Sequence, residues 1–282
     1  MSANGNSCHA SFSAGEFRGE YKENIKFLLA NGVLSAIEPR VCFWFETQLS
    51  QPIVMDGILG CGGRLLTDIL HSNPAIKEKS VTFEFGGGNL GSGSMIVGEK
   101  KLEEGEEIRW VSLVDLGGDY SKWVVRLMGA SIEGLPEEKQ KAVDGYLKGI
   151  SMNTIVDTGH HVIGLPAMLM PFFLETLLEA NPDFKATMEE MRMRYFRQDE
   201  YTFHLPCRLN IPTITFSLAA LGDSSTLHDF SFTKEDLFYP TDDGEECLLP
   251  LSGQSAFGRA FLRKYPATFD VVKNAVGFRV SI

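Results

Sequence analysis

The chain has 282 residues, of which 44% are hydrophobic and 22% are charged, and its formal net charge at pH 7 is −11. This length allows a sizeable hydrophobic core. The acidic balance, without a run rich in Lys or Arg, argues against nucleic acid and anionic membrane surfaces as partners. No apolar stretch reaches the roughly 18–20 residues that a membrane span needs, so we expect no membrane partner.

The N-terminal segment and the cysteines predict a cytoplasmic protein. Residues 1–20 are small and polar, without the basic and apolar regions of a signal peptide, and we expect a disordered tail. The five cysteines are scattered and form no Cys-x-x-Cys pair, which favours reduced thiols in the cytoplasm. The six histidines show no His-x-x-x-His spacing, so we expect no metal site.

Strand and helix patterns alternate in the first part of the chain. Helical spacing is seen at 20–34, 63–74 and 92–105. Runs rich in β-branched and aromatic residues lie between these segments, at 40–45, 80–85 and 107–115. Such alternation is typical of parallel βαβ units, so we predict the α/β class.

The pattern changes after residue 117. Helices are predicted over 135–150, 167–180 and 183–196, a strand over 209–221, and a last helix over 256–276, interrupted at Pro266. We therefore predict one domain over 1–282. Its α/β core comprises 21–118 and 196–282, and 119–195 form a helical lid insertion.

The stretch FGGGNLGSG at 85–93 permits three interpretations. The spacing of its glycines fits the Gly-x-Gly-x-x-Gly fingerprint of dinucleotide-binding proteins, and Asp115 stands where such proteins have the acidic residue that binds the ribose. It also fits the nucleophile elbow Gly-x-Ser-x-Gly, with Asn89 in place of serine. The third interpretation is a plain structural turn. The elbow requires a strand-to-helix turn, so an antiparallel hairpin over 81–97 would exclude the hydrolase interpretation.

Three longer stretches resemble thioesterase domains of polyketide and nonribosomal peptide synthetases. Residues 83–115 are similar to the elbow with its following helix and strand, 165–221 to lid helices and the next core strand, and 253–276 to the loop that carries the catalytic histidine and the closing helix. The resemblance implies an α/β-hydrolase fold, with a mostly parallel sheet and a helical lid.

The resemblance also implies a catalytic triad that this chain does not keep. Asn89 stands at the nucleophile position, and Ser255 stands where the histidine is expected. Only the acid position survives, as Asp115 or as Asp223. Because an amide is a poor nucleophile, triad hydrolysis is not expected.

Other residues are candidates through the expected lid and pocket. His160 and His161, in VDTGHHVIG, are candidates for an acid–base role from the lid, and a capping role is the alternative. The expected ligand-binding residues lie at the elbow and on the lid: Gly88, Leu90, Met168, Phe172 and Phe173.

The predicted function is that of a pseudo-hydrolase of secondary metabolism. It would bind a hydrophobic acyl- or polyketide-like small molecule, or process it without hydrolysis, for example by steering a cyclisation. Any activity would then be of the cyclase, lyase or isomerase type, with no cofactor and with a carrier protein as a candidate partner. One alternative is an enzyme dependent on S-adenosylmethionine or a dinucleotide, because 57–74 resemble a methyltransferase turn and helix with Glu84 at the ribose position. Another is a non-catalytic interaction module.

Overall fold

The computed structural model describes residues 7–12, 15–22, 26–29, 32–35, 41–49, 70–71, 74, 76–86, 93–98, 100–115, 123–149, 152–197, 202–241 and 244–282. The chain divides into two compact units. The first comprises Met1–Lys79 with Gly118–Ser121, and the second comprises Ser80–Gly117 with Lys122–Ile282. Each unit is described by itself.

The described part of the first unit consists mainly of short antiparallel strands. One sheet has the order β1-β2-β5, built from β1 (Ser7–Phe12), β2 (Gly15–Lys22) and β5 (Val41–Leu49). A separate hairpin pairs β3 (Lys26–Leu29) with β4 (Gly32–Ser35). The helix predicted over 20–34 is therefore wrong.

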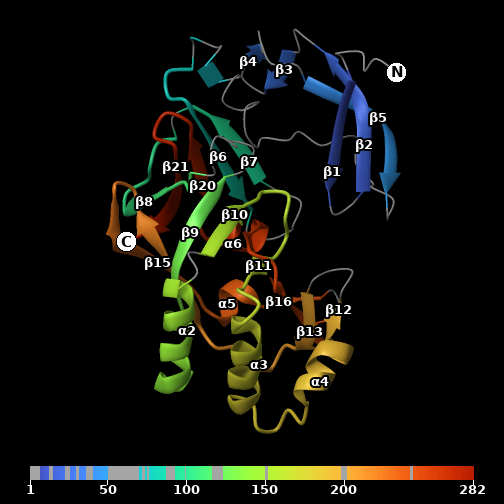
Figure 1. The fold of residues 1–282 in the computed structure, drawn as a ribbon, viewed down its shortest axis with the longest axis vertical. Coiled ribbons are helices and arrows are strands. Elements are labelled where there is room, and N and C mark those ends of the chain that lie inside the picture. The colour runs from blue at the N-terminus through green and yellow to red at the C-terminus, as the bar shows by residue number, and fades with distance from the viewer. Residues whose placement is uncertain are drawn as a thin grey trace. The chain divides into compact units, whose positions relative to one another are not determined.

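The second unit is built on one large sheet (Figure 1). Its strand order is β18-β11-β19-β10-β9-β14-β8-β21-β20-β6-β7, and β15 pairs with β14 outside this path. The strands are β6 (Ser80–Phe85), β7 (Gly93–Val97), β8 (Glu106–Ser112), β9 (Val124–Ile132), β10 (Met152–Val156), β11 (Ile163–Gly164), β14 (Ile214–Ala220), β15 (Asp223–Phe232), β18 (Leu251–Ser252), β19 (Ala256–Phe257), β20 (Ala267–Asp270) and β21 (Ala275–Ser281).

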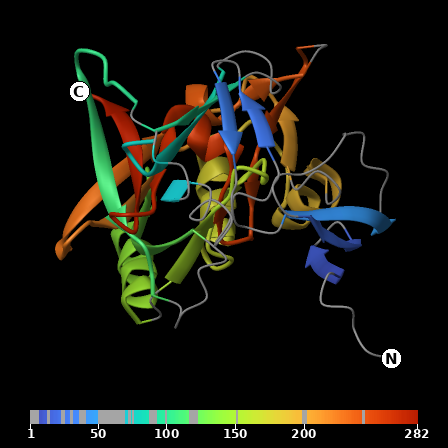
Figure 2. The ribbon, with the colours of Figure 1, turned by 90° about the horizontal axis from the view of Figure 1, so that it is seen from above.

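Antiparallel pairing dominates this sheet. Among the described strands, only β10 with β19 and β11 with β18 pair in parallel. Figure 2 shows the red C-terminal strand β21 beside the green strand β8, its antiparallel partner. The predicted α/β class with a mostly parallel sheet is therefore wrong, and so is the α/β-hydrolase fold implied by the thioesterase resemblance.

The glycine stretch connects two antiparallel strands. Strand β6 pairs with β7 in a register that places Val81 opposite Val97 and Phe85 opposite Gly93. The helix predicted over 92–105 is wrong, because β7 occupies its beginning. Cross-strand contacts explain this outcome: Glu84 lies opposite Ser94, whose hydroxyl donates a 2.9 Å hydrogen bond to its carboxylate. The hairpin excludes the elbow and the phosphate-binding loop, since both need a following helix.

The helices do not form a separate lid. They are α2 (Glu137–Gly149), α3 (Leu169–Glu179), α4 (Met188–Glu190), the π-helical turn η1 (Met191–Tyr195), α5 (Lys234–Leu237) and α6 (Arg259–Lys264). Helices α2 and α3 confirm the predictions over 135–150 and 167–180. Between them, however, β10 and β11 join the large sheet near one of its ends. The predicted helical lid over 119–195 is therefore wrong.

The C-terminal segment is a short helix followed by a hairpin. Helix α6 ends before Pro266, and β20 then pairs with β21. The buried carboxylate of Asp270 accepts hydrogen bonds from the N–H groups of Val272 and Lys273 in the connecting turn. Asn274 adopts a positive φ of 50°, which asparagine tolerates better than most residues. The single helix predicted over 256–276 is wrong beyond α6, because the turn returns the chain into the sheet.

Phenylalanines fill the core between the sheet and α6. We call them the phenylalanine cluster: Phe216, Phe230, Phe232, Phe257, Phe261 and Phe278, each at most 1% exposed. The rings of Phe257 and Phe261 stack with centroids 4.1 Å apart, and Phe261 meets Phe278 at 5.3 Å. These contacts connect β19 and α6 to β14, β15 and β21 through one apolar core.

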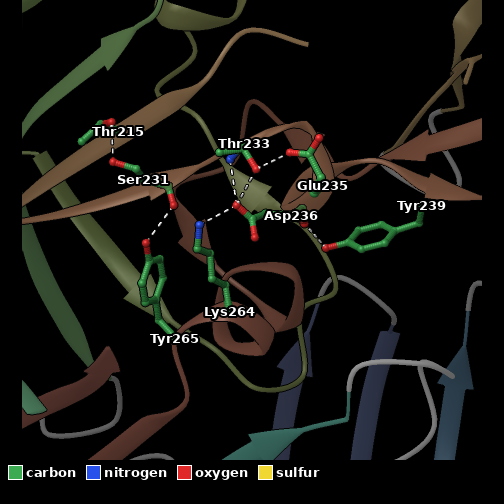
Figure 3. Close-up of polar contacts among 8 residues, drawn as sticks. All are labelled: Thr215, Ser231, Thr233, Glu235, Asp236, Tyr239, Lys264 and Tyr265. Carbon is green, nitrogen blue, oxygen red and sulfur yellow. Dashed lines mark hydrogen bonds and ion pairs between the residues drawn. The ribbon is translucent and has the colours of Figure 1, made fainter. Parts of the chain in front are cut away.

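Polar contacts fix α5 and α6 to β15 (Figure 3). Before α5, the N–H and the hydroxyl of Thr233 both donate to the carboxylate of Asp236. Lys264, at the end of α6, pairs with the same carboxylate. The hydroxyl of Tyr265 donates to the carbonyl of Ser231 at 2.8 Å, and burial raises the pKa of Tyr265 to about 12. The C-terminal end of α6 is thereby anchored to β15.

A smaller sheet carries a disulfide. Its order is β12-β13-β17-β16, from β12 (Phe196–Arg197), β13 (Thr202–Pro206), β17 (Glu246–Leu249) and β16 (Tyr239–Pro240). Cys207, directly after β13, is bonded to Cys247 of β17. The expectation that all cysteines are reduced thiols is therefore wrong for this pair.

A separate finding concerns the helices: across the described ranges, none is both long and apolar enough to span a membrane.

We expect the disulfide to stabilise the second unit substantially. The two cysteines are 40 residues apart, and closing a loop of this length stabilises the folded state by about 4 kcal/mol in the chain-entropy estimate. Replacing both cysteines with serine should lower the free energy of unfolding by roughly this amount, measured by urea denaturation. Reduction of the unmutated protein should have a similar effect. Equal midpoints for the oxidised, reduced and substituted proteins would contradict the prediction.

Candidate active site

Two segments that are distant in sequence cross at one end of the large sheet. Strand β19 lies between β10, with which it is parallel, and β11, with which it is antiparallel. The chain therefore leaves β10 on one side of β19, passes through residues 157–162, and enters β11 on the other side. We call residues 156–165 together with 250–259 the crossing.

Backbone hydrogen bonds hold the two halves of the crossing together. The N–H of Asp157 donates to the carbonyl of Phe257 at 3.1 Å. In the opposite direction, the N–H of Gly258 donates to the carbonyl of Val162 at 2.9 Å. Further along, the N–H of Leu165 donates to the carbonyl of Ser252 at 2.8 Å. The connection from β10 to β11 is thus hydrogen-bonded at both ends.

Two glycines make this close approach possible. A Cβ on Gly164 would lie 1.6 Å from the carbonyl oxygen of Gln254. A Cβ on Gly258 would lie 2.4 Å and 2.6 Å from the carbonyl oxygens of His160 and Val162. Backbone atoms cannot move aside as a flexible side chain can, so a larger residue at either position requires the crossing to open.

Asp157 lies at the turn where the chain leaves β10. Val156 before it is buried, whereas Asp157 itself is exposed. The turn is closed by a 3.2 Å hydrogen bond from the N–H of His160 to the carbonyl of Asp157. One carboxylate oxygen, Oδ1, accepts the N–H of Gly159 at 2.8 Å. The structure therefore presents an exposed carboxylate with one oxygen fixed by the backbone, a geometry suited to acid–base chemistry.

The two adjacent histidines follow this carboxylate. The rings of His160 and His161 have centroids 5.7 Å apart. His160 is half-buried, and its Nε2 is a buried atom without a hydrogen-bond partner. Burial lowers the pKa of His160, the positive charge of His161 lowers it further, and the carboxylate of Asp157 opposes both effects. The structure thus brings both predicted histidines to the crossing.

Ser255 also belongs to the crossing. Its hydroxyl donates to the carbonyl of Asn153 at 2.8 Å and lies 3.2 Å from the hydroxyl of Thr154. These contacts hold the residue before β19 against β10. The expected role of Ser255 in place of a catalytic histidine depended on the hydrolase fold, and it stays a prediction.

The two candidate acids belong to segments other than residues 157–162. Asp115 is exposed, shortly after β8. Asp223 begins β15 and is also exposed. Hydrogen bonds from Ser225 and Thr226 lower the pKa of Asp223 to about 2. These bonds stabilise the start of β15 after the turn from β14, which is a structural use of the carboxylate.

The expected ligand-binding residues separate into two groups. Asn89, Gly88 and Leu90 lie outside the described residues. Met168 immediately precedes α3 and is half-buried, as is Phe172. Phe173 is fully buried in the core. The roles assigned to these residues stay predictions, although the elbow and lid that motivated them are absent from the described part of the chain.

Asp157 is the residue that the sequence reasoning missed. The stretch VDTGHHVIG drew attention only through its histidines. The available signal was Asp-Thr-Gly directly after the apolar strand Met152–Val156. A carboxylate at a glycine-containing turn that ends a buried strand is a recurrent way to present an acid–base group.

Two other features of the described residues were candidates for a site, a metal cluster and a cavity. Within the described ranges, no group of three or more His, Cys, Asp or Glu side chains could hold a metal ion. A cavity of about 510 Å³ in the second unit is lined by four cations, Arg109, Arg263, Lys264 and Arg279. Carboxylates already offset most of this charge: Glu107 lies 2.9 Å from Arg109, and Glu84 lies 2.7 Å from Arg279. Glu84, the candidate ribose ligand, is thus part of an ion-pair network.

Comparison with protein-family models and with curated proteins finds no match to this chain. The interpretation of the crossing therefore depends on its own geometry.

We expect Gly258→Ala to destabilise the second unit. The added Cβ would clash with two backbone carbonyls, and overpacking of this kind costs about 3 kcal/mol or more where the backbone cannot relax. Gly253→Ala is the matched control, because a Cβ there meets nothing within 4 Å. Its effect should stay within about 0.5 kcal/mol. Thermal and urea unfolding should separate the two variants, and equal midpoints would contradict the described crossing.

A pH dependence of stability should follow from His160. Its pKa in the folded state is lowered below 6.5, so the unfolded chain binds the proton more readily. The free energy of unfolding should therefore decrease as the pH falls through 6.5 towards the folded pKa, and should be unaffected by this group above that range. Urea denaturation at pH 7.5 and 5.5 measures the decrease, and His160→Asn should reduce it. An equal decrease in the variant would contradict the prediction.

Proposed function

We propose that the second unit is one lobe of an aspartic-protease-type hydrolase, with Asp157 as one of its two catalytic carboxylates. The observation that supports this most directly is the carboxylate of Asp157 at an Asp-Thr-Gly turn, which the crossing fixes at the end of β10. An Asp-Thr-Gly turn on two crossed strands resembles the catalytic turn of pepsin-like proteases. Such proteases use two aspartates that share one proton.

The chemistry assigned to Asp157 follows from its contacts. In a carboxylate pair, the ionised member takes a proton from water as the water attacks the peptide carbonyl, and the protonated member donates to the carbonyl oxygen. The N–H of Gly159 donates to Oδ1 of Asp157 at 2.8 Å. The other oxygen, Oδ2, is then the one available to a water molecule or a substrate.

The pair requires a second carboxylate. The hydrogen bonds and ion pairs of the described residues bring none to Asp157. In our proposal, the partner carboxylate comes from outside the described residues of the second unit.

Earlier hypotheses about ligands stay untested. Binding of a hydrophobic small molecule, docking of a carrier protein, chemistry with S-adenosylmethionine or a dinucleotide, and a non-catalytic interaction role have no supporting contact among the described residues. The thioesterase and polyketide assignments depended on a hydrolase fold that the antiparallel sheet contradicts. Among the described residues, the turn at Asp157 is the feature that supports a reaction.

The disulfide suggests where such an enzyme would work. Disulfides persist in oxidising compartments and are rare in the cytoplasm. The bond between Cys207 and Cys247 therefore favours the secretory pathway or the cell exterior over the predicted cytoplasmic location. We propose an oxidising compartment as the site of action.

The proposed activity predicts cleavage of an unfolded protein, such as casein, at acidic pH. Acid-soluble peptides released between pH 3 and 6.5 would be quantified for the full chain. Asp157→Asn should lower kcat/KM by on the order of 10³-fold or more, because an amide cannot take up the proton from water. Binding of a hydroxyl-containing peptide isostere, a mimic of the hydrated peptide bond, should weaken in parallel.

Asp183→Asn is the matched control. Asp183 is exposed on the connection between α3 and α4, so the same change of side chain should leave cleavage within two-fold. Equal activity of the wild-type and Asp157→Asn proteins would contradict the role of Asp157. Absence of cleavage by the wild-type protein over this whole pH range would contradict the proposed function.

A further inference from the structure

The cavity of about 510 Å³ in the second unit lies at the C-terminal end of α6, whereas the crossing contains the first residue of that helix. Residues of β8, β15, α6 and β21 line it. Pockets that bind small molecules commonly have volumes of about 300–1,000 Å³. The lining includes four cations but only two carboxylates, Glu106 and Asp229, in a chain whose net charge is −11. The charge facing the cavity is therefore opposite to that of the chain.

Three of the four cations already pair with carboxylates. Arg109 and Lys264 each pair with one carboxylate, and Arg279 pairs with two, at 2.7 Å and 3.3 Å. Of these four carboxylates, only Glu106 belongs to the lining of the cavity. These ion pairs account for three cations by contacts within the protein, and they leave the fourth without such an account.

The fourth cation is Arg263, in the last turn of α6. It is half-buried, and its guanidinium has no ion pair or hydrogen bond with the described residues. Its contact is with the ring of Tyr239, whose centroid lies 3.9 Å from Cζ of the guanidinium. A charge that is partly removed from water is unfavourable unless it is paired, so this arginine lacks a counter-charge.

The stacking on Tyr239 determines which part of the guanidinium can bind a ligand. The hydroxyl of Tyr239 donates to the carbonyl of Asp236, which fixes the ring (Figure 3). Stacking occupies the flat face of the guanidinium and leaves the N–H groups at its edge free to donate. Because Arg263 lines the cavity, a group inside the cavity can reach these donors. The edge of a guanidinium matches two oxygens of a carboxylate or a tetrahedral oxyanion.

The remaining lining offers an apolar surface beside the cations. It includes Tyr265, Pro266 and Val280. Tyr265 is held in place by the 2.8 Å hydrogen bond from its hydroxyl to the carbonyl of Ser231. Ligand sites typically combine such apolar surface with a few polar groups that orient the ligand. The cavity thus provides cations for an oxyanion and a rigid apolar wall for an organic group attached to it.

We propose that this cavity binds a small organic ester of a tetrahedral oxyanion, a phosphate or a sulfate, with Arg263 as its main donor. A phosphate ester carries a charge of about −1.5 to −2 at pH 7, more than a sulfate ester, so phosphate should bind more tightly. The proposal uses no residue of the crossing, and it is independent of the proposed proteolytic function.

Calorimetric titration of the full chain at pH 7 and constant ionic strength tests the site, with phenyl phosphate and phenyl sulfate as probes and sodium chloride as the reference. The wild-type protein should bind phenyl phosphate at one saturable site. Arg263→Gln should weaken this binding by at least ten-fold, because the charged donor edge is lost. Arg192→Gln is the matched control. Arg192 is exposed in η1 and outside the lining, so its replacement should change the affinity by less than two-fold.

Each outcome decides the proposal. Tighter binding of phenyl phosphate identifies a phosphate ester as the ligand class, and tighter binding of phenyl sulfate identifies a sulfate ester. Unchanged affinity in Arg263→Gln, or an equal loss in Arg192→Gln, would overturn the site, because binding would then reflect general attraction between charges. Absence of saturable binding of both esters below about 10 mM would also overturn it. If Arg263→Gln fails to fold, Arg263→Lys takes its place: it keeps the charge but loses the planar edge, and it should still weaken binding by about three-fold or more.

Discussion

The second unit depends on the passage of residues 156–165 past residues 250–259 at a distance that leaves no room for a side chain. Gly164 and Gly258 are the positions where a Cβ would meet backbone oxygens, at 1.6 Å and 2.4 Å respectively. This contact forces β19 between β10 and β11, and thereby turns the chain at residues 157–162. The exposed carboxylate of Asp157 and the unpaired nitrogen of His160 both result from that single constraint.

The crossing is stable because its inner side is part of the core. Phe257, which pairs with Val156 of β10, belongs to the phenylalanine cluster, and Phe261 stacks on it one helical turn later. The far end of α6 is held by Tyr265 and Lys264 (Figure 3). Functional groups are effective when rigid elements support them, and here the polar turn is supported by β10, β19 and α6 together.

Local patterns predicted the elements whose stabilising contacts are local. Helices α2 and α3 have regular helical spacing, and strands β6, β8 and β14 are rich in β-branched and aromatic residues, so all five were recognisable. The pairing of the strands could not be recognised from the sequence, because strand partners are far apart along the chain. The hydroxyl groups of Thr82 and Thr268, for example, are 186 residues apart and hydrogen-bond at 2.8 Å. The predicted helix over 92–105 failed for the same reason, since β7 is defined by its partner β6. Asp157 was missed because its significance requires β19, about 100 residues later, to lie beside it.

Asp157 alone does not make the proposed centre. A lone exposed carboxylate is a weak catalyst, and it becomes an effective member of a pair only when a second carboxylate and exclusion of water make the two share a proton. Such a pair carries a single negative charge, so that one member can act as the base while the other acts as the acid. The crossing supplies one half of this requirement, because it holds one oxygen of the exposed Asp157 carboxylate by the N–H of Gly159 at a turn supported by the core.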